Sequence, residues 1–275
     1  VNVLADFTKR DSRELTAEDY VYGIKRLAHP RLHSPIFSMM AERIVGLREL
    51  GAALQAEAKA LPAGAWLDLD RFPLTGVTRV DRYTYRITLR GKYPQFAYWL
   101  AMPFFAPVPR EVDRFYSQPG MAEKNLTLDW YPVGTGPFML THNNPNSRMV
   151  LERNPNFHGE TYPCQGEPED GAAGLLADCG KPLPLADGFR FSYEREAPPF
   201  WNKFLQGYYD FYSSARFAGF ASFDTALQVQ GDGLSLSRQM LEQGITLRTE
   251  IEPSVEYFFV NMLDPVLGNG ADTPE

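Results

Sequence analysis

The chain has 275 residues, of which 44% are hydrophobic and 13% aromatic, and its formal net charge is -7. This length supplies one large or two modest domains, since a typical domain has about 100 to 200 residues. The acidic balance excludes the basic face that a nucleic-acid-binding protein needs. No run of the sequence approaches the roughly 18 apolar residues that span a membrane. Neither a nucleic-acid partner nor membrane insertion is therefore expected.

Three helices are predicted near the beginning of the chain. Thr16 is a suitable N-cap, and Asp19 stands three residues later in the position of a capping-box partner. The apolar side chains that follow share one helical face until Pro30 ends the pattern. A second helix is predicted from Ile36 to about Ile44, and a third from Leu47 to about Leu61.

Strands and short helices are predicted to follow. Val77 and Val80 suggest one strand, and alternating apolar residues over 85–89 indicate a second on the other side of the Asp81-Arg82 turn. A short, very apolar helix is predicted over 95–101, and the prolines after it favour an extended segment. A further helix is predicted over 110–116.

A β-hairpin is predicted after Gly134 and Gly136. These glycines are interpreted as positions whose backbone angles a side chain would forbid, so that a turn leads into an apolar strand around 138–140. Turn-forming residues at 143–146 and a second apolar run at 149–151 complete the hairpin.

A β-α-β unit is predicted farther along the chain. Its parts are a strand around 189–193, a helix opened by Pro198 and Pro199, and a second strand over 208–212. The connection is expected to be right-handed and the strands parallel. Helices at 220–228 and 235–243 and strands at 245–251 and 255–262 are expected to follow. This alternation predicts a mixed α/β fold.

Four short blocks occur in a characteristic order. They are 15–22 with Arg26-Leu27, then Ala106-Pro107-Val108-Pro109, then Gly134-Thr135-Gly136 with 150–155 and Phe157, and finally 261–265. Together they resemble family 5 of the extracellular solute-binding proteins, the receptors of ABC importers for peptides and other solutes. The resemblance extends over nearly the whole chain.

The resemblance implies a periplasmic-binding-protein-like fold of type II, in which two lobes close around a solute. Residues 1–132 are similar to the small extra domain of the family, and residues 133–262 to the central part of the first ligand-binding lobe. Residues 263–275 would lead toward the second lobe. Family members are usually longer and begin with a signal peptide, so the chain is expected to be an internal fragment that binds solute weakly by itself.

The implied function is that of the substrate-binding component of an ABC importer. Such a protein captures peptides or similar small solutes and delivers them to the transmembrane subunits of a permease. It is not an enzyme and needs no cofactor. The expected location is the periplasm, or the extracellular side with a tether to the membrane surface.

The two cysteines, Cys164 and Cys179, lie in the loop 160–187, which is rich in Gly, Pro and acidic residues. An exported protein meets the oxidising compartment that a disulfide requires. A bridge would close a loop of about 15 residues and stabilise it by roughly 3 kcal/mol in the chain-entropy model. A disulfide is therefore expected, with two free thiols as the alternative. Because His158 is the only nearby imidazole, a metal site is not expected there.

Two segments are candidates for contact with solute. Ser213, Ser214 and Arg216 follow a predicted strand at its carboxyl end, where α/β sheets bind ligands. Related peptide-binding proteins often have amide side chains here, whereas hydroxyl and guanidinium groups suit polar or anionic solutes. An ordinary turn before a helix is the alternative. Ile36 and Phe37 stand where some members have a tyrosine that contacts peptide.

Other arrangements of polar residues predict less. His29 and His33 have helical i, i+4 spacing, but Pro30 breaks the register that a metal-binding pair would need. Asp68 and Asp70 are a close carboxylate pair of the kind used in acid–base catalysis, with ordinary solvated acids as the alternative. A hydrolase that uses this pair, and a scaffold domain without a transport role, are the alternatives to a binding protein.

Overall fold

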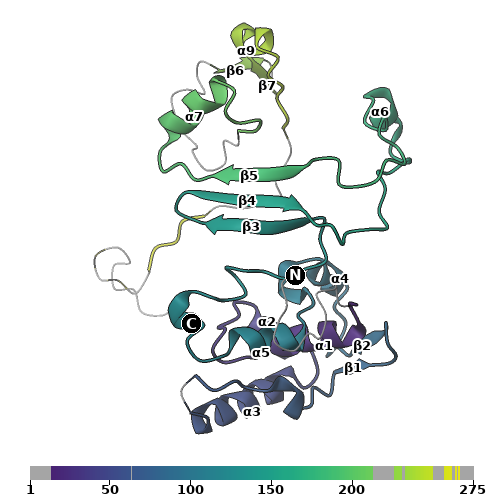
Figure 1. The fold of residues 1–275 in the computed structure, drawn as a ribbon, viewed down its shortest axis with the longest axis vertical. Helices are drawn as coiled ribbons and strands as arrows, with labels where there is room; N and C mark the ends of the chain where they lie inside the picture. Colours follow the sequence, from purple (N-terminus) through teal and green to yellow (C-terminus); the bar gives the residue numbers. More distant parts are fainter. Residues whose placement is uncertain are drawn as a thin grey trace. The chain divides into compact units, whose positions relative to one another are not determined.

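The computed structural model describes residues 14–62, 64–212, 226–230, 233–249 and 257–261, together with Asp264 and Val266. Helices and strands alternate along it, so the predicted mixed α/β class is confirmed. The chain divides into two compact units, Val1–Tyr193 and Glu194–Glu275. Figure 1 shows the order of the elements.

The first unit begins with three helices, as predicted. They are α1 (Ala17–Arg26), α2 (Phe37–Arg43) and α3 (Leu47–Ala60). The carboxylate of Asp19 accepts a hydrogen bond of 2.8 Å from the backbone N–H of Thr16 and thereby forms part of a capping box at the start of α1. An aspartate thus does here what a glutamate or glutamine usually does.

One hydrophobic core joins these helices to the segments that follow them. Side chains with 0% exposure at its centre are Met40, Ile44, Leu47, Leu54 and Leu69. Each fully buried side chain of this size contributes about 1.5–3 kcal/mol of transfer free energy. The core therefore accounts for the packing of α1, α2 and α3 against the chain that returns from α3.

The strand pair is also present where it was predicted. β1 (Val77–Arg79) and β2 (Tyr85–Ile87) are antiparallel, with Val77 opposite Ile87, and both pack against α1. The short helix η1 (Leu69–Arg71) precedes the pair. Four helical segments follow it, namely α4 (Phe96–Leu100), η2 (Pro103–Phe105), α5 (Arg110–Tyr116) and η3 (Ala122–Lys124). The predictions for 95–101 and 110–116 are thus confirmed.

Two backbone segments of the first unit cross at very short range. A Cβ atom on Gly76 would lie 2.2 Å from the carbonyl oxygen of Val45, and one on Gly46 would lie 2.4 Å from Oγ1 of Thr75. Gly46, just before α3, also has a φ angle of +80°, which a side chain rarely permits. Glycine is therefore required at both positions.

The predicted hairpin consists of β3 (Phe138–Asn144) and β4 (Arg148–Arg153), and β5 (Gly188–Ser192) extends it to a three-stranded antiparallel sheet. Leu151 in the central strand lies opposite Leu140 on one side and Phe189 on the other. The interpretation of Gly134 and Gly136 was wrong. Neither has a positive φ, and nothing lies within 4 Å of a Cβ on either.

The loop between β4 and β5 contains the predicted disulfide between Cys164 and Cys179. It also contains the short helix α6 (Pro168–Ala172), which the sequence pattern did not indicate. The hydroxyl of Tyr162 donates a 2.8 Å hydrogen bond to the carbonyl of Leu175. A covalent bond and local hydrogen bonds therefore hold this loop together.

The second unit differs from the prediction. It contains α7 (Ala197–Leu205), as expected, then β6 (Leu227–Gln230), β7 (Gly233–Leu236) and α9 (Arg238–Glu242). No strand forms at 208–212, and β5 pairs antiparallel with β4, so the parallel β-α-β unit was wrong. The side chains of Tyr208 and Phe211 are 72% and 76% exposed. An alternating pattern cannot form a strand without a neighbour to pair with.

The remaining predicted elements are confirmed only in part. Of the helix expected at 220–228, Ala226 is helical, residues 227–228 belong to β6, and residues 220–225 lie outside the described residues. The helix expected at 235–243 begins at Arg238, because β7 occupies the residues before it. Residues 245–249 and 257–261 form no strand, and the other residues of those two predicted strands are not described.

Replacing Gly76 by alanine is expected to lower the free energy of unfolding by about 1–3 kcal/mol, because the new methyl group would overlap the carbonyl of Val45. Gly136→Ala is the matched control, since its Cβ would meet open space. Its effect is expected to stay within about 0.5 kcal/mol. Urea unfolding of both variants measures the difference, and equal losses would contradict the crossing at Gly76.

Candidate functional site

The predicted solute-binding residues Ser213, Ser214 and Arg216 lie outside the described residues. The second candidate pair lies in and next to α2. Ile36 is 6% exposed and belongs to the core of the first unit. Phe37 is half-buried, with its ring over Gly51 of α3, where a Cβ would come within 2.4 Å of ring atom Cζ. Both side chains thus pack inward, and a contact with solute stays a prediction for each.

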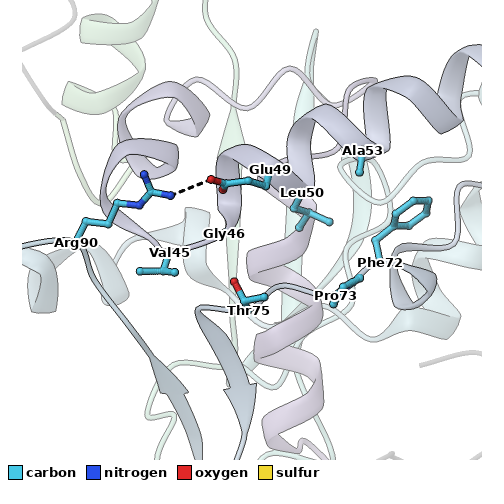
Figure 2. A pocket seen from close by; sticks show the side chains of 9 residues that line it. All are labelled: Val45, Gly46, Glu49, Leu50, Ala53, Phe72, Pro73, Thr75 and Arg90. Atoms are coloured by element: carbon cyan, nitrogen blue, oxygen red, sulfur yellow. Dashed lines mark hydrogen bonds and ion pairs between the residues drawn. The ribbon is translucent and has the colours of Figure 1, made fainter.

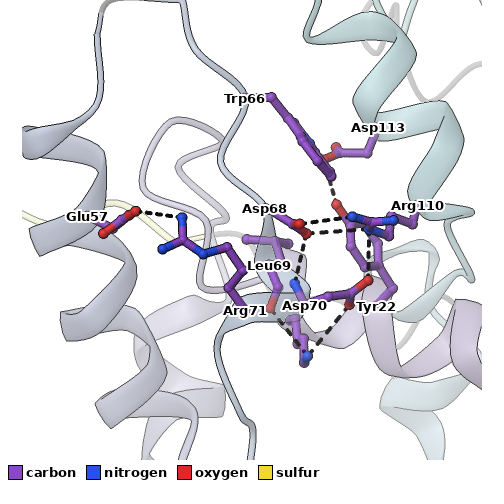
Figure 3. A network of polar contacts seen from close by, with 10 residues as sticks. Tyr22, Glu57, Trp66, Asp68, Leu69, Asp70, Arg71, Arg110 and Asp113 are labelled. Atoms are coloured by element: carbon purple, nitrogen blue, oxygen red, sulfur yellow. Dashed lines mark hydrogen bonds and ion pairs between the residues drawn. The ribbon is translucent and has the colours of Figure 1, made fainter.

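A buried carboxylate lies between α5 and α1 (Figure 3). Asp113 is 8% exposed and accepts hydrogen bonds from the Tyr22 hydroxyl (2.8 Å), Arg26 Nε (3.0 Å) and Trp66 Nε1 (3.3 Å). A buried charge is tolerated when it is paired and hydrogen-bonded in this way. This arrangement therefore positions α5 on α1 and on the segment that carries Trp66.

The carboxylates of Asp68 and Asp70 share a partner in the same region. Nη2 of Arg110 lies 2.8 Å from Oδ2 of Asp68, and its Nε lies 2.8 Å from Oδ2 of Asp70. The Asp68 side chain also accepts from the backbone N–H of Asp70, at the start of η1. Lys25 adds a longer ion pair of 3.8 Å to Asp70. The two carboxylates therefore share Arg110 as a partner and connect η1 to α5.

A pocket of about 420 Å³ opens beside the first half of α3 (Figure 2). Its lining residues come from α3 and from three neighbouring segments; they are Val45, Gly46, Glu49, Leu50, Ala53, Phe72, Pro73, Thr75 and Arg90. At one end, Nη2 of Arg90 donates to Oε1 of Glu49 at 3.0 Å. Hydrogen bonds from its own backbone N–H and then from Arg90 lower the pKa of Glu49, which keeps this carboxyl group ionised at neutral pH.

Sequence reasoning did not find this pocket. Glu49 and Arg90 are 41 positions apart, and neither belongs to a recognisable motif. The apolar members look like ordinary core residues in the sequence. A smaller hollow of about 360 Å³ borders Trp66 and Arg114.

Metal binding has no candidate among the described residues, where no three His, Cys, Asp or Glu side chains gather. His29 and His33 were not expected to form a metal site. Within the same residues, no helix combines the length and the apolar character that crossing a membrane requires.

The family assignment comes from the sequence as a whole. The family model described as "Bacterial extracellular solute-binding proteins, family 5 Middle" matches residues 10–271. The chain therefore belongs to this family, and the predicted periplasmic-binding-protein-like class follows from that membership.

Individual relatives agree with the assignment. The chain is 30% identical over 148 residues to the periplasmic oligopeptide-binding protein OppA of Salmonella typhimurium. The matched region covers 54% of this chain and 23% of that protein. It is 26% identical over 147 residues to the probable deoxycholate-binding periplasmic protein YgiS of Escherichia coli. That match covers 54% of this chain and 24% of the relative. The chain thus spans less than two thirds of either relative.

Solved structures resemble the chain more distantly. The substrate-binding domain of an oligopeptide ABC transporter from Bacillus anthracis matches with a TM-score of 0.48 at 19% identity, over 72% of this chain and 30% of that one. A periplasmic oligopeptide-binding protein from Borrelia burgdorferi matches with a TM-score of 0.47 at 21% identity, over 70% and 30%. The family assignment does not depend on these matches.

Asp113→Asn is expected to lower the free energy of unfolding by about 3–5 kcal/mol, because it removes the anionic partner of a half-buried guanidinium. Glu42→Gln is the control, since its ion pair with Arg48 is 3.8 Å long and exposed. Calorimetric unfolding of the two variants measures the effect. A loss for Asp113→Asn no larger than that of the control would contradict the role of this carboxylate.

His29 is expected to make the protein sensitive to mild acid. Burial lowers the pKa of its imidazole, Asp113 opposes this shift, and Arg26 and Arg31 add to it. Its Nδ1 also accepts from the backbone N–H of Arg31 at 3.2 Å, which requires an unprotonated nitrogen.

Because the folded protein binds this proton less readily than the unfolded chain, stability falls as the pH drops below about 6.5, the ordinary pKa of histidine. Thermal unfolding between neutral pH and pH 5 is expected to change less for His29→Gln than for the natural protein. Identical pH profiles would show that His29 does not contribute.

Proposed function

We propose that the protein is the substrate-binding component of an ABC importer that captures peptides or similar small solutes in the periplasm and delivers them to a permease. The observation that carries this proposal is the family match over residues 10–271. The names of the relatives support it, since they describe periplasmic proteins that bind oligopeptides or, in one case, deoxycholate. Asp68 and Asp70 both form ion pairs with Arg110, and this structural role supports a binding protein over a hydrolase that uses the two carboxylates.

The roles proposed for the segments of the chain are those expected from the sequence. Residues 1–132 act as the small extra domain, residues 133–262 as the central part of the first ligand-binding lobe, and residues 263–275 lead toward the second lobe. Solute binds at Ser213, Ser214 and Arg216. Binding stabilises the closed arrangement of the lobes by its higher affinity for that arrangement, and the permease recognises the closed protein.

Native mass spectrometry of the protein purified from its own periplasm tests the class of solute, and peptides are expected to accompany it. Calorimetry with the same peptides tests the site. Arg216→Gln is expected to weaken binding of acidic peptides roughly tenfold or more, because a hydrogen bond to a charged group is worth about 1.5–3 kcal/mol.

Arg195→Gln is the matched control, since Arg195 is exposed and lies outside the proposed site. Unchanged affinity in Arg216→Gln would remove this residue from the site. Bound molecules that are not peptides, together with no affinity for any peptide, would overturn the proposed solute class.

A further inference from the structure

The pocket beside α3 combines apolar lining residues with one polar pair. Its volume of about 420 Å³ lies within the range of about 300–1,000 Å³ that is usual for ligand pockets. Among its lining residues, Leu50 is buried, Phe72 is half-buried, and Ala53 and Pro73 are exposed. In Figure 2, Phe72 and Pro73 lie toward the end of the pocket opposite Arg90. Apolar surface is thus gathered in a concave place.

The other end of the pocket is polar and accessible. The side chains of Arg90 and Glu49 are 46% and 64% exposed, and they hydrogen-bond to each other. A guanidinium and a carboxylate side by side present donors next to an acceptor. That is the pattern needed to bind a peptide group, whose carbonyl accepts from Arg90 and whose N–H donates to Glu49.

The pocket is already formed by rigid parts of the first unit. The backbone N–H of Val45 donates to the carbonyl of Thr88 at 3.1 Å, and that of Arg90 donates to Arg43 at 2.7 Å. The close approach at Gly46 and Gly76 holds the adjoining segments. A preformed site loses little conformational entropy when it binds.

We propose that this pocket binds one apolar side chain of an extended peptide, with the flanking peptide groups on Arg90 and Glu49. The occupant is uncharged at this side chain, because a charge placed against Leu50 and Phe72 would lose its hydration without gaining a partner. The site belongs to the first unit, carries no residue of the segment 213–216, and does not depend on the function proposed above.

The test is a titration of the whole chain, labelled with ¹³C in its methyl groups, with N-acetylphenylalaninamide. This probe has one apolar side chain between two amide groups. Resonances of Val45, Leu50 and Ala53 are expected to shift together with a dissociation constant on the order of 1 mM, as suits a very small ligand. N-acetylglutaminamide, of similar size but polar, is expected to produce much smaller shifts.

Two variants locate the site. Ala53→Trp fills the pocket and is expected to abolish the shifts of Val45 and Leu50. Ala56→Trp, one turn later at an exposed position of α3 that does not line the pocket, is expected to leave them unchanged. Arg90→Gln is expected to weaken binding about threefold to tenfold, which is the scale of one hydrogen bond.

Three results would contradict the proposed peptide site. Absence of shifts with N-acetylphenylalaninamide, equal shifts with N-acetylglutaminamide, or persistence of the shifts in Ala53→Trp would each overturn it. Either result leaves the proposed importer function unaffected, because that function is tested by native mass spectrometry of the purified protein and its site by Arg216→Gln.

Discussion

The crossing of the chain at Gly46 and Gly76 is the contact on which the first unit depends. At this point the segment that leads into α3 passes the segment that leads into β1, with a carbonyl oxygen where a Cβ atom would otherwise be. Leu47 and Leu50 enter the core directly after the crossing. A wider separation would displace α3 from the core and open the walls of the pocket shown in Figure 2. Packing and the pocket therefore share one steric requirement.

Polar contacts, together with the hydrophobic core, hold the helices of the first unit in place. Asp113 fixes α5 against α1, and Arg110, three residues earlier, is held by Asp68 and Asp70 at η1. The guanidinium of Arg110 also lies 4.9 Å from the centre of the Trp66 ring, within the range of a cation–π interaction. Charges that look catalytic in the sequence thus connect α1, η1 and α5 (Figure 3).

Local elements were predictable where short-range chemistry decides them. The capping residues Thr16 and Asp19 specify the start of α1, and the turn-forming residues between β3 and β4 specify their hairpin. Cysteines in a loop without periodicity indicated the disulfide. The strand at 208–212 failed because pairing depends on residues far away in the sequence, and alternation alone supplies no partner. Similarly, Gly134 and Gly136 looked conformationally special, whereas the structure requires glycine at other positions, Gly46 and Gly76 among them.

Among the candidate sites, too, some were predicted from the sequence and others were found only in the structure. Membership of the solute-binding family came from ordered sequence blocks, whereas the proposed role of Ser213 to Arg216 came from a predicted strand at 208–212 that the structure does not show. By contrast, the inward packing of Ile36, the sharing of Arg110 by two aspartates and the meeting of Glu49 with Arg90 came only from the structure. The sequence by itself determined family, helix starts and the covalent link, because each depends on neighbouring residues or on overall pattern. The tertiary structure decided which charges pair and where a pocket forms, because those contacts join positions tens of residues apart.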